Sequence, residues 1–410
     1  MPKALALAAV LAVAGCAADG GAPPEPAPPE AVAGERAVPA GDGALAPRLS
    51  LDAEGVPLLS WTEARGDSVA LRYARWTGDG WGPAHTADAG TGRFVNWADT
   101  PGVVALADGR LLAHSFVMHP DGDSPYAYDV RVRQRGADRS GANRRGGAWG
   151  PPVTPHTDGV PAEHGFVSVV PHADGRAGLV WLDGRNQGGH GHGGGAMTLR
   201  YAALDPDGAL ADEAELDARA CDCCPTAAVA TPGGVAVAYR DRSAGEVRDV
   251  AVVRLVGGAW TEPAVPHADG WEIAGCPVNG PALAARGDRV ALAWYTAAGD
   301  RPRVRLTVSD DGGATFGPAA EVDGGAPLGR VGVALLPDGD AVVGWLEGGA
   351  GAAEVRLRRV GGVPAGRTVA VVPAGRESGV PVVVALGRRV LVAWTDPDAA
   401  PAVRTAVVDV

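Results

Sequence analysis

Residues 280–318, GPALAARGDRVALAWYTAAGDRPRVRLTVSDDGGATFGP, contain all parts of a unit that recurs along this 410-residue chain. A run of small residues, PALAA, leads into the tight turn ARGDR and then into the apolar segment ALAWYT. A third short run, RVRLTVS, follows, and an aromatic and a proline open an edge segment at ATFGP. Turns of Gly and Asp between short apolar runs are typical of β-hairpins. The stretch therefore predicts four short antiparallel strands.

The unit recurs with its second strand ending near an aromatic or polar residue. Its seven copies lie around Trp61, Ser115, Trp181, Tyr239, Trp294, Trp345 and Trp394. Four-stranded units spaced by about 50 to 65 residues predict an all-β fold, a seven-bladed β-propeller of four-stranded antiparallel blades. A six-bladed ring is the alternative if one unit is irregular. Because the five repeated tryptophans occupy the same place in each unit, we expect them in the core between blades.

The two ends of the chain are expected to meet in one blade. The last unit, from residue 379 to residue 410, has three strands and then stops, whereas residues 35–40 resemble the segment that leads into it. These residues are predicted to supply the missing outer strand, which removes an open sheet edge.

The N-terminus predicts export. The opening MPKALALAAVLAVAGCAADGG has one lysine, a short apolar run, small residues and a cysteine, which is the layout of a secretory signal. Val13 to Cys16 resembles a bacterial lipobox, whose cysteine is lipidated, and ordinary signal cleavage is the alternative. We predict a lipoprotein signal peptide over 1–15, a Pro/Ala-rich tether over 16–34 and one propeller domain over 35–410. The protein is then held to the lipid bilayer of the bacterial cell envelope, at the membrane surface or in the periplasm, through Cys16.

Composition excludes one class of partner. The formal net charge of -12 and the pI near 5.2 leave no basic stripe for phosphate groups, so we expect no nucleic-acid partner. Every later apolar run is interrupted before it reaches the length of a membrane span. The chain is expected to be monomeric.

One segment carries a motif of a known family. Residues 309–316, SDDGGATF, fit the Asp-box pattern Ser-x-Asp-x-Gly-x-Thr-Phe. Its residues are Ser309, Asp311, Gly313, Thr315 and Phe316. In this motif and in its repeats, the chain resembles the sialidase-like or BNR-repeat superfamily over nearly its whole mature length, and a six-bladed sialidase-type propeller is the corresponding alternative fold. Asp boxes stabilise turns, so the motif supports the fold and says little about activity.

Four cysteines of the mature chain lie in loops expected on one face of the ring. Cys221, Cys223 and Cys224 are in RACDCCPT, and Cys276 is in the corresponding loop of the next blade. In an exported protein they are candidates for a disulfide that joins Cys221 or Cys223 to Cys276. The same residues, with His164 as a further ligand, are candidates for a Cu(I) or zinc site. Thiol redox chemistry is the third possibility, although the sequence has no CxxC motif at a helix start.

Other metal-ligating side chains are expected near that face. They are Met118, His119, His190 and His192. For the two histidines of HGHGGG, at 190–195, a solvated glycine-rich loop without metal is the favoured interpretation, and a chelating pair is the alternative.

The resemblance also implies a test for catalysis. A sialidase needs three arginines that clamp the substrate carboxylate, an Asp as acid/base and a Tyr nucleophile activated by a Glu. The catalytic candidates are Arg48, Asp99, Arg240, Asp241 and Arg330. The Arg-Ile-Pro motif of the family is missing, and no tyrosine follows Tyr295. Whether the protein is an enzyme therefore stays uncertain at this point.

A binding function agrees better with these departures. We predict a propeller that binds a glycan or a small anionic ligand, with a metal or a disulfide at its cysteine-rich rim. The ligand-binding candidates are Asn96, Trp97, Arg240, Asp241 and Arg242. Packing of Trp97 and a rim ion-pair network of the arginines are the structural alternatives. An exo-sialidase-type glycoside hydrolase and a structural or partner-docking propeller are the alternative functions.

Overall fold

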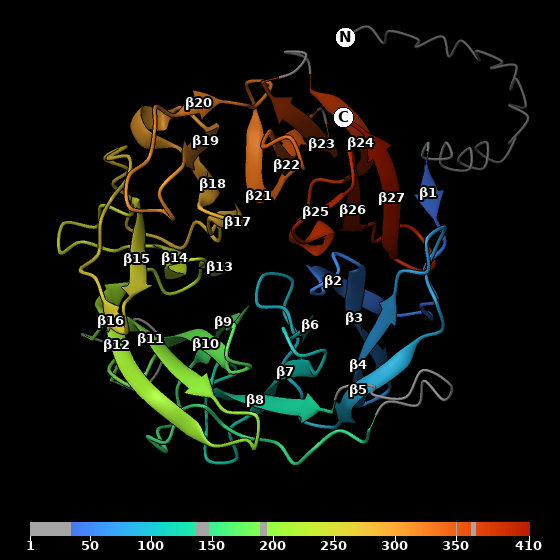
Figure 1. The fold of residues 1–410 in the computed structure, drawn as a ribbon, viewed down its shortest axis with the longest axis vertical. Helices are drawn as coiled ribbons and strands as arrows, with labels where there is room; N and C mark the ends of the chain where they lie inside the picture. Colours follow the sequence, from blue (N-terminus) through green and yellow to red (C-terminus); the bar gives the residue numbers. More distant parts are fainter. Residues whose placement is uncertain (1–33, 137–146, 189–194, 350, 362–365) are drawn as a thin grey trace, which may run out of the picture. The chain divides into compact units, whose positions relative to one another are not determined.

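The computed structural model describes residues 34–136, 147–188, 195–349, 351–361 and 366–410. These residues belong to one compact unit, which starts at Val32. Seven small antiparallel sheets follow one another around a ring, and Figure 1 shows them in chain order from blue to red. The fold is the predicted seven-bladed, all-β propeller. Among the described residues, the only helical segments are two short 3-10 turns, η1 (Ala298–Asp300) and η2 (Arg376–Ser378).

Blades 1 to 4 follow the order of the chain from the innermost to the outermost strand. Blade 1 consists of β2 (Ala44–Leu51), β3 (Pro57–Arg65), β4 (Ser68–Arg75) and β5 (His85–Gly90). Blade 2 consists of β6 (Gly102–Ala105), β7 (Leu111–Met118) and β8 (Tyr128–Arg135). Its outer position is filled by single bridges from Trp149 and Val153 to β8. Blade 3 consists of β9 (His164–Pro171), β10 (Ala177–Asp183), β11 (Met197–Leu204) and β12 (Leu210–Ala220). Blade 4 consists of β13 (Ala227–Thr231), β14 (Gly234–Arg240), β15 (Val250–Val256) and β16 (Ala259–Trp260).

Blades 5 to 7 repeat the pattern. Blade 5 consists of β17 (Ala282–Arg286), β18 (Arg289–Thr296), β19 (Arg303–Ser309) and β20 (Ala320–Glu321). Blade 6 consists of β21 (Pro327–Leu335), β22 (Ala341–Gly348), β23 (Ala352–Val360) and β24 (Arg367–Pro373). Blade 7 consists of β25 (Val382–Leu386), β26 (Arg389–Thr395), β27 (Val403–Asp409) and β1 (Glu35–Arg36).

The ring closes in blade 7, where the first strand pairs with the last. Glu35 lies opposite Ala406 and Arg36 opposite Thr405 in an antiparallel ladder. Figure 1 shows β1, in blue, beside β27, in red. The Glu35 carboxylate also forms an ion pair with Arg404. The predicted pairing of the two chain ends is therefore present, and it covers the outer edge of β27.

The repeated tryptophans form the core between blades, as predicted. Trp61, Trp181, Trp294, Trp345 and Trp394 are each at most 1% exposed. In three blades the indole N–H donates to a carboxylate two residues later; one of these bonds joins Trp345 to Glu347 at 2.6 Å. Glu347 also accepts the backbone N–H groups of Gly324 and Ala326 at 3.0 and 2.6 Å. One carboxylate thus fixes the core tryptophan and the loop before the innermost strand.

The Asp-box residues form a tight turn between β19 and β20. The Asp311 carboxylate accepts the backbone N–H of Thr315 at 2.9 Å and its hydroxyl at 2.6 Å. These bonds hold the pKa of Asp311 well below its ordinary value. Phe316 packs against the core between blades 4 and 5. The turn is built by its own side chains, as a folding motif requires.

The predicted signal peptide with Cys16, and the tether up to residue 33, lie outside the described residues. His190 and His192 also lie outside them. Export and the lipid anchor therefore stay predictions. In the described ranges we find no helix with the length and apolarity that a membrane crossing requires.

Replacing Glu347 tests the link between the core and the loops. Glu347→Gln keeps the shape of the side chain but leaves one carbonyl oxygen for three donors, so a buried N–H loses its acceptor. We expect the free energy of unfolding to fall by about 1 to 3 kcal/mol in urea denaturation. The control is Glu262→Gln at an exposed position. Equal stability of the two variants would contradict this role of Glu347.

Candidate functional site

Two neighbouring loops bring the cysteines together on the rim of the ring. The loop from β12 to β13 carries Cys221, Cys223 and Cys224, and the segment between β16 and β17 carries Cys276. The Cys221 N–H donates to the Arg240 carbonyl at the end of β14, at 2.9 Å. This backbone bond ties the cysteine loop to the middle of its own blade.

The three sulfurs of the first loop converge. The Cys221 Sγ lies 3.4 Å from that of Cys224 and 4.0 Å from that of Cys223. All three lie within 4.8 Å of one another. Cys221 and Cys224 are at most 1% exposed, Cys223 is half-buried and Cys276 is exposed. The Cys276 sulfur, on the neighbouring loop, is not part of this group of three. The cluster is therefore buried at Cys221 and Cys224 and partly open to solvent at Cys223.

The structure contains no disulfide among the four cysteines of the described chain. The predicted link from Cys221 or Cys223 to Cys276 is absent. The Cys221 sulfur lies 3.4 and 4.0 Å from its two neighbours, far above the roughly 2.05 Å of an S–S bond. These separations match thiolates around one ion instead, since metal–sulfur bonds of about 2.3 Å in a tetrahedron place the sulfurs about 3.8 Å apart.

Positive charge and N–H donors surround the sulfurs. The Arg248 guanidinium donates to the Cys221 Sγ at 3.1 Å, and the Asn279 backbone N–H donates to the Cys224 Sγ at 3.4 Å. The Cys221 thiol has a pKa well below its ordinary value, because Cys223 and Cys224 donate to it and the arginines outweigh part of the burial. Burial and the negative charge of Cys221 raise the pKa of Cys224. The site therefore stabilises at least one thiolate.

The sequence YRDRS beside the cysteines is engaged within the protein. Arg240 is 2% exposed, and its guanidinium donates to the backbone carbonyls of Asn279, Arg248 and Tyr295 at 2.6 to 2.9 Å. It also stacks on Trp271. Arg240 therefore joins three segments and does not face a ligand basin.

The two residues after Arg240 also have partners in the chain. Arg242 forms ion pairs with Asp222 at 3.1 Å and with Glu246 at 2.8 Å. The Asp241 carboxylate accepts the backbone N–H of Arg242 at 2.6 Å, and burial raises its pKa to about 6. These contacts correspond to the rim ion-pair alternative for the YRDRS segment.

His164 does not join the cysteines. It is fully buried in a separate cluster with aspartates of blades 2 and 3. His119 accepts the backbone N–H of Asp121 through Nδ1 at 3.2 Å, and Met118 packs against a core between blades 2 and 3. Within the described residues, the only side chains that share the metal-sized group with Cys221 are Cys223 and Cys224.

The centre of the ring holds a cavity of about 720 Å³. Its walls are mostly apolar side chains of the innermost strands. At one wall Trp97 is half-buried, and the Arg330 guanidinium lies 4.5 Å from the centre of its ring. Asn96, the other residue predicted beside it, also lines the cavity and accepts the Ala98 N–H at 2.9 Å.

The three candidate arginines of a carboxylate clamp do not converge on one ligand. Arg48 lines the cavity and donates to the carbonyls of Thr100 and Val167 at 3.0 and 3.4 Å. Arg330 donates to the carbonyls of Gly375 and Gly379. Arg240 is saturated by carbonyls, as described above. Each guanidinium stabilises loops, so the geometry does not reproduce the sialidase clamp that the resemblance implied.

Asp99 belongs to a carboxylate pair that the sequence did not reveal. Its Oδ2 lies 2.7 Å from the hydroxyl of Tyr128, and Glu163 Oε1 lies 3.1 Å from the same hydroxyl. A single hydroxyl proton cannot be donated to both, so both bonds form only when one carboxyl group is protonated. Burial raises the pKa of Asp99 to about 7 and that of Glu163 to about 8. Tyr128 itself is fully buried.

Comparison with known proteins identifies the fold. No protein-family model and no curated protein sequence matches the chain. A PL25 ulvan lyase solved with -[GlcA(1-4)Rha3S]- bound is 13% identical, with a TM-score of 0.52 over 92% of this chain and 93% of that chain. The chain shares its β-propeller fold with this lyase. The NanB sialidase of Streptococcus pneumoniae is 11% identical, with a TM-score of 0.43 over 94% and 71% of the two chains. The GH93 α-L-arabinofuranosidase of Fusarium graminearum is 14% identical, with a TM-score of 0.44 over 90% and 93%.

The sequence predicted the cysteine loops of this propeller. It did not reveal Arg248 as a partner of Cys221, nor Tyr128 as a partner of the two carboxylates. Arg248 lies in RDV, after the YRDRS segment. Its distance from Cys221 along the sequence gives no indication of a contact between the two. Tyr128 opens β8 in YDVRVRQR and looked like an ordinary strand aromatic. The one available signal is Glu163, a carboxylate just before an innermost strand, which needs a hydrogen-bond donor such as the Tyr128 hydroxyl.

The carboxylate pair predicts a pH dependence of stability. The folded-state pKa of Asp99 is above its unfolded value, so the unfolded chain releases this proton first and raising the pH favours unfolding. The free energy of unfolding should fall between about pH 4 and pH 7, by up to about 4 kcal/mol for this group. Asp99→Asn, which can still accept the Phe166 N–H and donate to Tyr128, should remove that part of the fall.

Urea denaturation at several pH values measures this effect. Asp67→Asn, at an exposed turn, is the matched control and should keep the wild-type pH profile. A profile of Asp99→Asn as steep as that of the wild type would show that Asp99 is ionised without cost.

Proposed function

We propose that this propeller binds a thiophilic metal ion, Cu(I) or Zn²⁺, at the cysteine rim. The observation that carries the proposal is the convergence of three sulfurs: that of Cys221 lies 3.4 Å from that of Cys224 and 4.0 Å from that of Cys223, and all three are within 4.8 Å of one another. Thiolates are the ligands that select these two ions. Cys276, exposed on the neighbouring loop, is our candidate for the fourth ligand.

The surroundings of the sulfurs suit a metal centre. Ligand sulfurs in metal sites usually accept hydrogen bonds that fix their orientation and tune their charge. Here the Arg248 guanidinium and the Asn279 N–H supply such bonds to Cys221 and Cys224. Three thiolates carry more negative charge than a divalent ion cancels, and the Arg248 side chain, 3% exposed, adds a positive charge against the inner sulfur.

The geometry also divides the ligands into two groups. Cys221 and Cys224 are buried on a loop whose backbone is fixed, whereas Cys276 is exposed on the next blade. An ion can therefore enter from the exposed Cys276 side and then bind the buried sulfurs of Cys221 and Cys224. Bound metal would also occupy thiols that an oxidising compartment would otherwise convert to disulfides.

Single cysteine substitutions test the centre. Cys221→Ser should weaken Zn²⁺ binding by roughly 100-fold or more, because it removes the inner thiolate, and Cys276→Ser by roughly 10-fold. Arg219→Gln, an exposed change near the end of β12, should leave the affinity unchanged. Competition with a chromophoric chelator under reducing conditions gives the affinities.

Co²⁺ substitution and thiol counting separate the outcomes. The wild-type protein loaded with Co²⁺ should give sulfur-to-cobalt charge-transfer bands, and these should weaken in Cys221→Ser. After removal of metal, four free thiols are expected in the mature protein. A non-reduced protein with two blocked thiols and no metal would overturn the proposal in favour of a disulfide.

Glycan binding in the central cavity is the second candidate function. It is favoured by the cavity of about 720 Å³ and by Trp97 at its wall with the Arg330 guanidinium on the ring. An aromatic face beside a guanidinium suits a sugar that carries a carboxylate or sulfate group. The protein would then hold such a sugar against the Trp97 wall of the central cavity.

Truncation of Trp97 tests the glycan site. On an array of neutral and uronic-acid oligosaccharides, the wild-type protein should retain acidic sugars, and Trp97→Ala should bind them about 10-fold more weakly, which is the loss of about 1.4 kcal/mol of contact energy. Trp149→Ala, at the outer edge of blade 2, is the control. Equal retention by Trp97→Ala and the wild type would place the sugar elsewhere, and no retention by either would exclude this function.

A further inference from the structure

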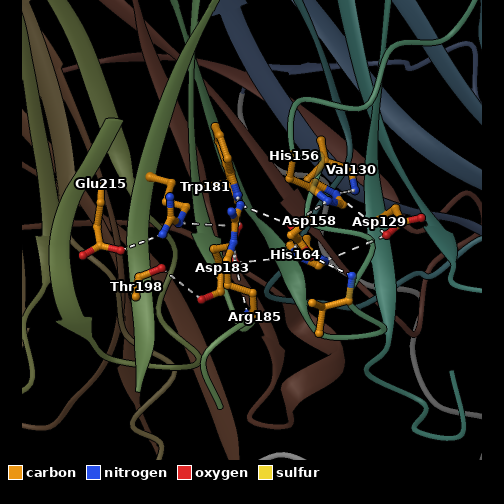
Figure 2. A network of polar contacts seen from close by, with 12 residues as sticks. Asp129, Val130, His156, Asp158, His164, Trp181, Asp183, Arg185, Thr198 and Glu215 are labelled. Atoms are coloured by element: carbon orange, nitrogen blue, oxygen red, sulfur yellow. Dashed lines mark hydrogen bonds and ion pairs between the residues drawn. The ribbon is translucent and has the colours of Figure 1, made fainter. Parts of the chain in front are cut away.

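A second group of metal-ligating side chains lies between blades 2 and 3, away from the cysteines. Figure 2 shows His164, from the start of β9, between Asp129 of β8 and Asp183 at the end of β10. His156 and Asp158 reach the same place from the segment before β9. None of these residues belongs to the thiol centre proposed above.

His164 is buried without a hydrogen-bond partner for either ring nitrogen. Its side chain is 0% exposed, and neither Nδ1 nor Nε2 makes a hydrogen bond. The Nε2 atom lies 3.3 Å from Asp158 Oδ2 and 3.6 Å from Asp183 Oδ1. Asp158 Oδ2 also lacks a hydrogen-bond donor. Because buried polar groups are almost always satisfied, these atoms indicate a missing partner.

The other end of the ring has a ready partner of its own. The His164 Nδ1 lies 3.9 Å from Asp129 Oδ1, so a proton on Nδ1 would point toward that carboxylate. This leaves the Nε2 lone pair facing Asp158 and Asp183. An imidazole that donates to a carboxylate through one nitrogen and binds a metal through the other is a common arrangement in metal sites.

His156 has a different role from His164. Its ring stacks on that of His164, with 3.7 Å between the ring centres. Its Nε2 accepts the backbone N–H of Val130 at 3.2 Å, so the proton of the neutral ring is on Nδ1. That proton faces Asp158 Oδ2 at 3.5 Å. His156 is therefore placed to orient Asp158 and to pack against His164.

Blade 3 departs here from the rest of the ring. In blades 1 and 6, the carboxylate two residues after the core tryptophan accepts backbone N–H groups of the loop before the innermost strand, as Glu63 and Glu347 do. In blade 3 that position is Asp183, whose Oδ1 accepts the Arg185 backbone N–H at 3.1 Å and lies 3.6 Å from His164 Nε2 at the start of β9. A histidine side chain, and not an amide of the loop before the innermost strand, therefore meets this carboxylate.

We propose that Asp158, His164 and Asp183 bind a divalent metal ion through oxygen and nitrogen ligands. Bonds of about 2.1 Å place neighbouring ligand atoms roughly 3.0 to 3.4 Å apart, close to the separations around Nε2. Carboxylates with one imidazole suit Mn²⁺, Fe²⁺ or Zn²⁺ and do not suit Cu(I). The site is independent of the thiol centre because the two share no ligand.

Arg185 lies against both carboxylates of the proposed site. Its guanidinium lies 2.7 Å from Asp183 Oδ2 and 3.2 Å from Asp158 Oδ2. With 17% of its side chain exposed, it is the most exposed residue in contact with these two carboxylates. Metal binding requires Arg185 to withdraw toward solvent. Its removal should therefore strengthen binding, whereas removal of an ordinary structural ion-pair partner would only destabilise the fold.

A Mn²⁺ titration followed by electron paramagnetic resonance tests the proposal, because thiolates compete poorly for this ion. The wild-type protein should bind one Mn²⁺, and His164→Ala should bind it at least 10-fold more weakly. Arg185→Gln should bind it more tightly. His172→Ala, which removes another histidine of blade 3, and Cys221→Ser, which disrupts the thiol centre, should leave Mn²⁺ affinity unchanged.

The same titration gives the outcomes that would overturn the site. Equal affinity of His164→Ala and the wild type, or no Mn²⁺ or Zn²⁺ bound by Cys221→Ser at millimolar metal, would show that the cluster is only a polar core. If His164→Ala does not fold, the Mn²⁺ affinity of Asp158→Asn replaces it as the test. The nuclear magnetic resonance signals of the wild-type protein then give a second, independent test. Bound Mn²⁺ should broaden the imidazole signals of His156 and His164, and unbroadened signals in the presence of Mn²⁺ would contradict the site.

Discussion

The structure depends on the closure of the ring by β1 and β27. A two-residue strand, Glu35–Arg36, pairs with Ala406 and Thr405, so the first and last residues of the propeller share one sheet. Closure leaves no end blade free to move, and the loops of neighbouring blades then have fixed partners. The loop of Cys276 can lie beside the loop of Cys223 only because the blades that carry them are held at this spacing.

Within the ring, the acidic residue after the core tryptophan links packing to chemistry. Where that residue is Glu347, its oxygens are filled by the Trp345 indole and two loop amides, and the position is purely structural. Where it is Asp183, the side chain is shorter and meets His164 and Arg185. A repeat position that stabilises one blade has thus become available for ligand chemistry in another, while the scaffold is kept by the remaining blades.

Much of the fold could be predicted because its signals are local and repeated. The turn ARGDR and the recurring tryptophans depend only on near neighbours in the sequence, and the missing strand of the last unit indicated the closure. The sites depend on side-chain directions that a repeat does not encode. The sequence brought Arg240 to the cysteine rim, but its guanidinium turns to backbone carbonyls of three segments. It grouped His164 with the cysteines, whereas the β9 register points the ring at aspartates of blades 2 and 3.

The central claim is that the cysteine rim holds a metal through sulfur. X-ray absorption at the metal edge of the purified, metal-loaded protein measures this directly, because sulfur and light-atom neighbours scatter differently. We expect three or four sulfur atoms at about 2.3 Å to dominate the first coordination shell of the metal. A first shell of only nitrogen and oxygen atoms at about 2.0 to 2.1 Å would contradict it.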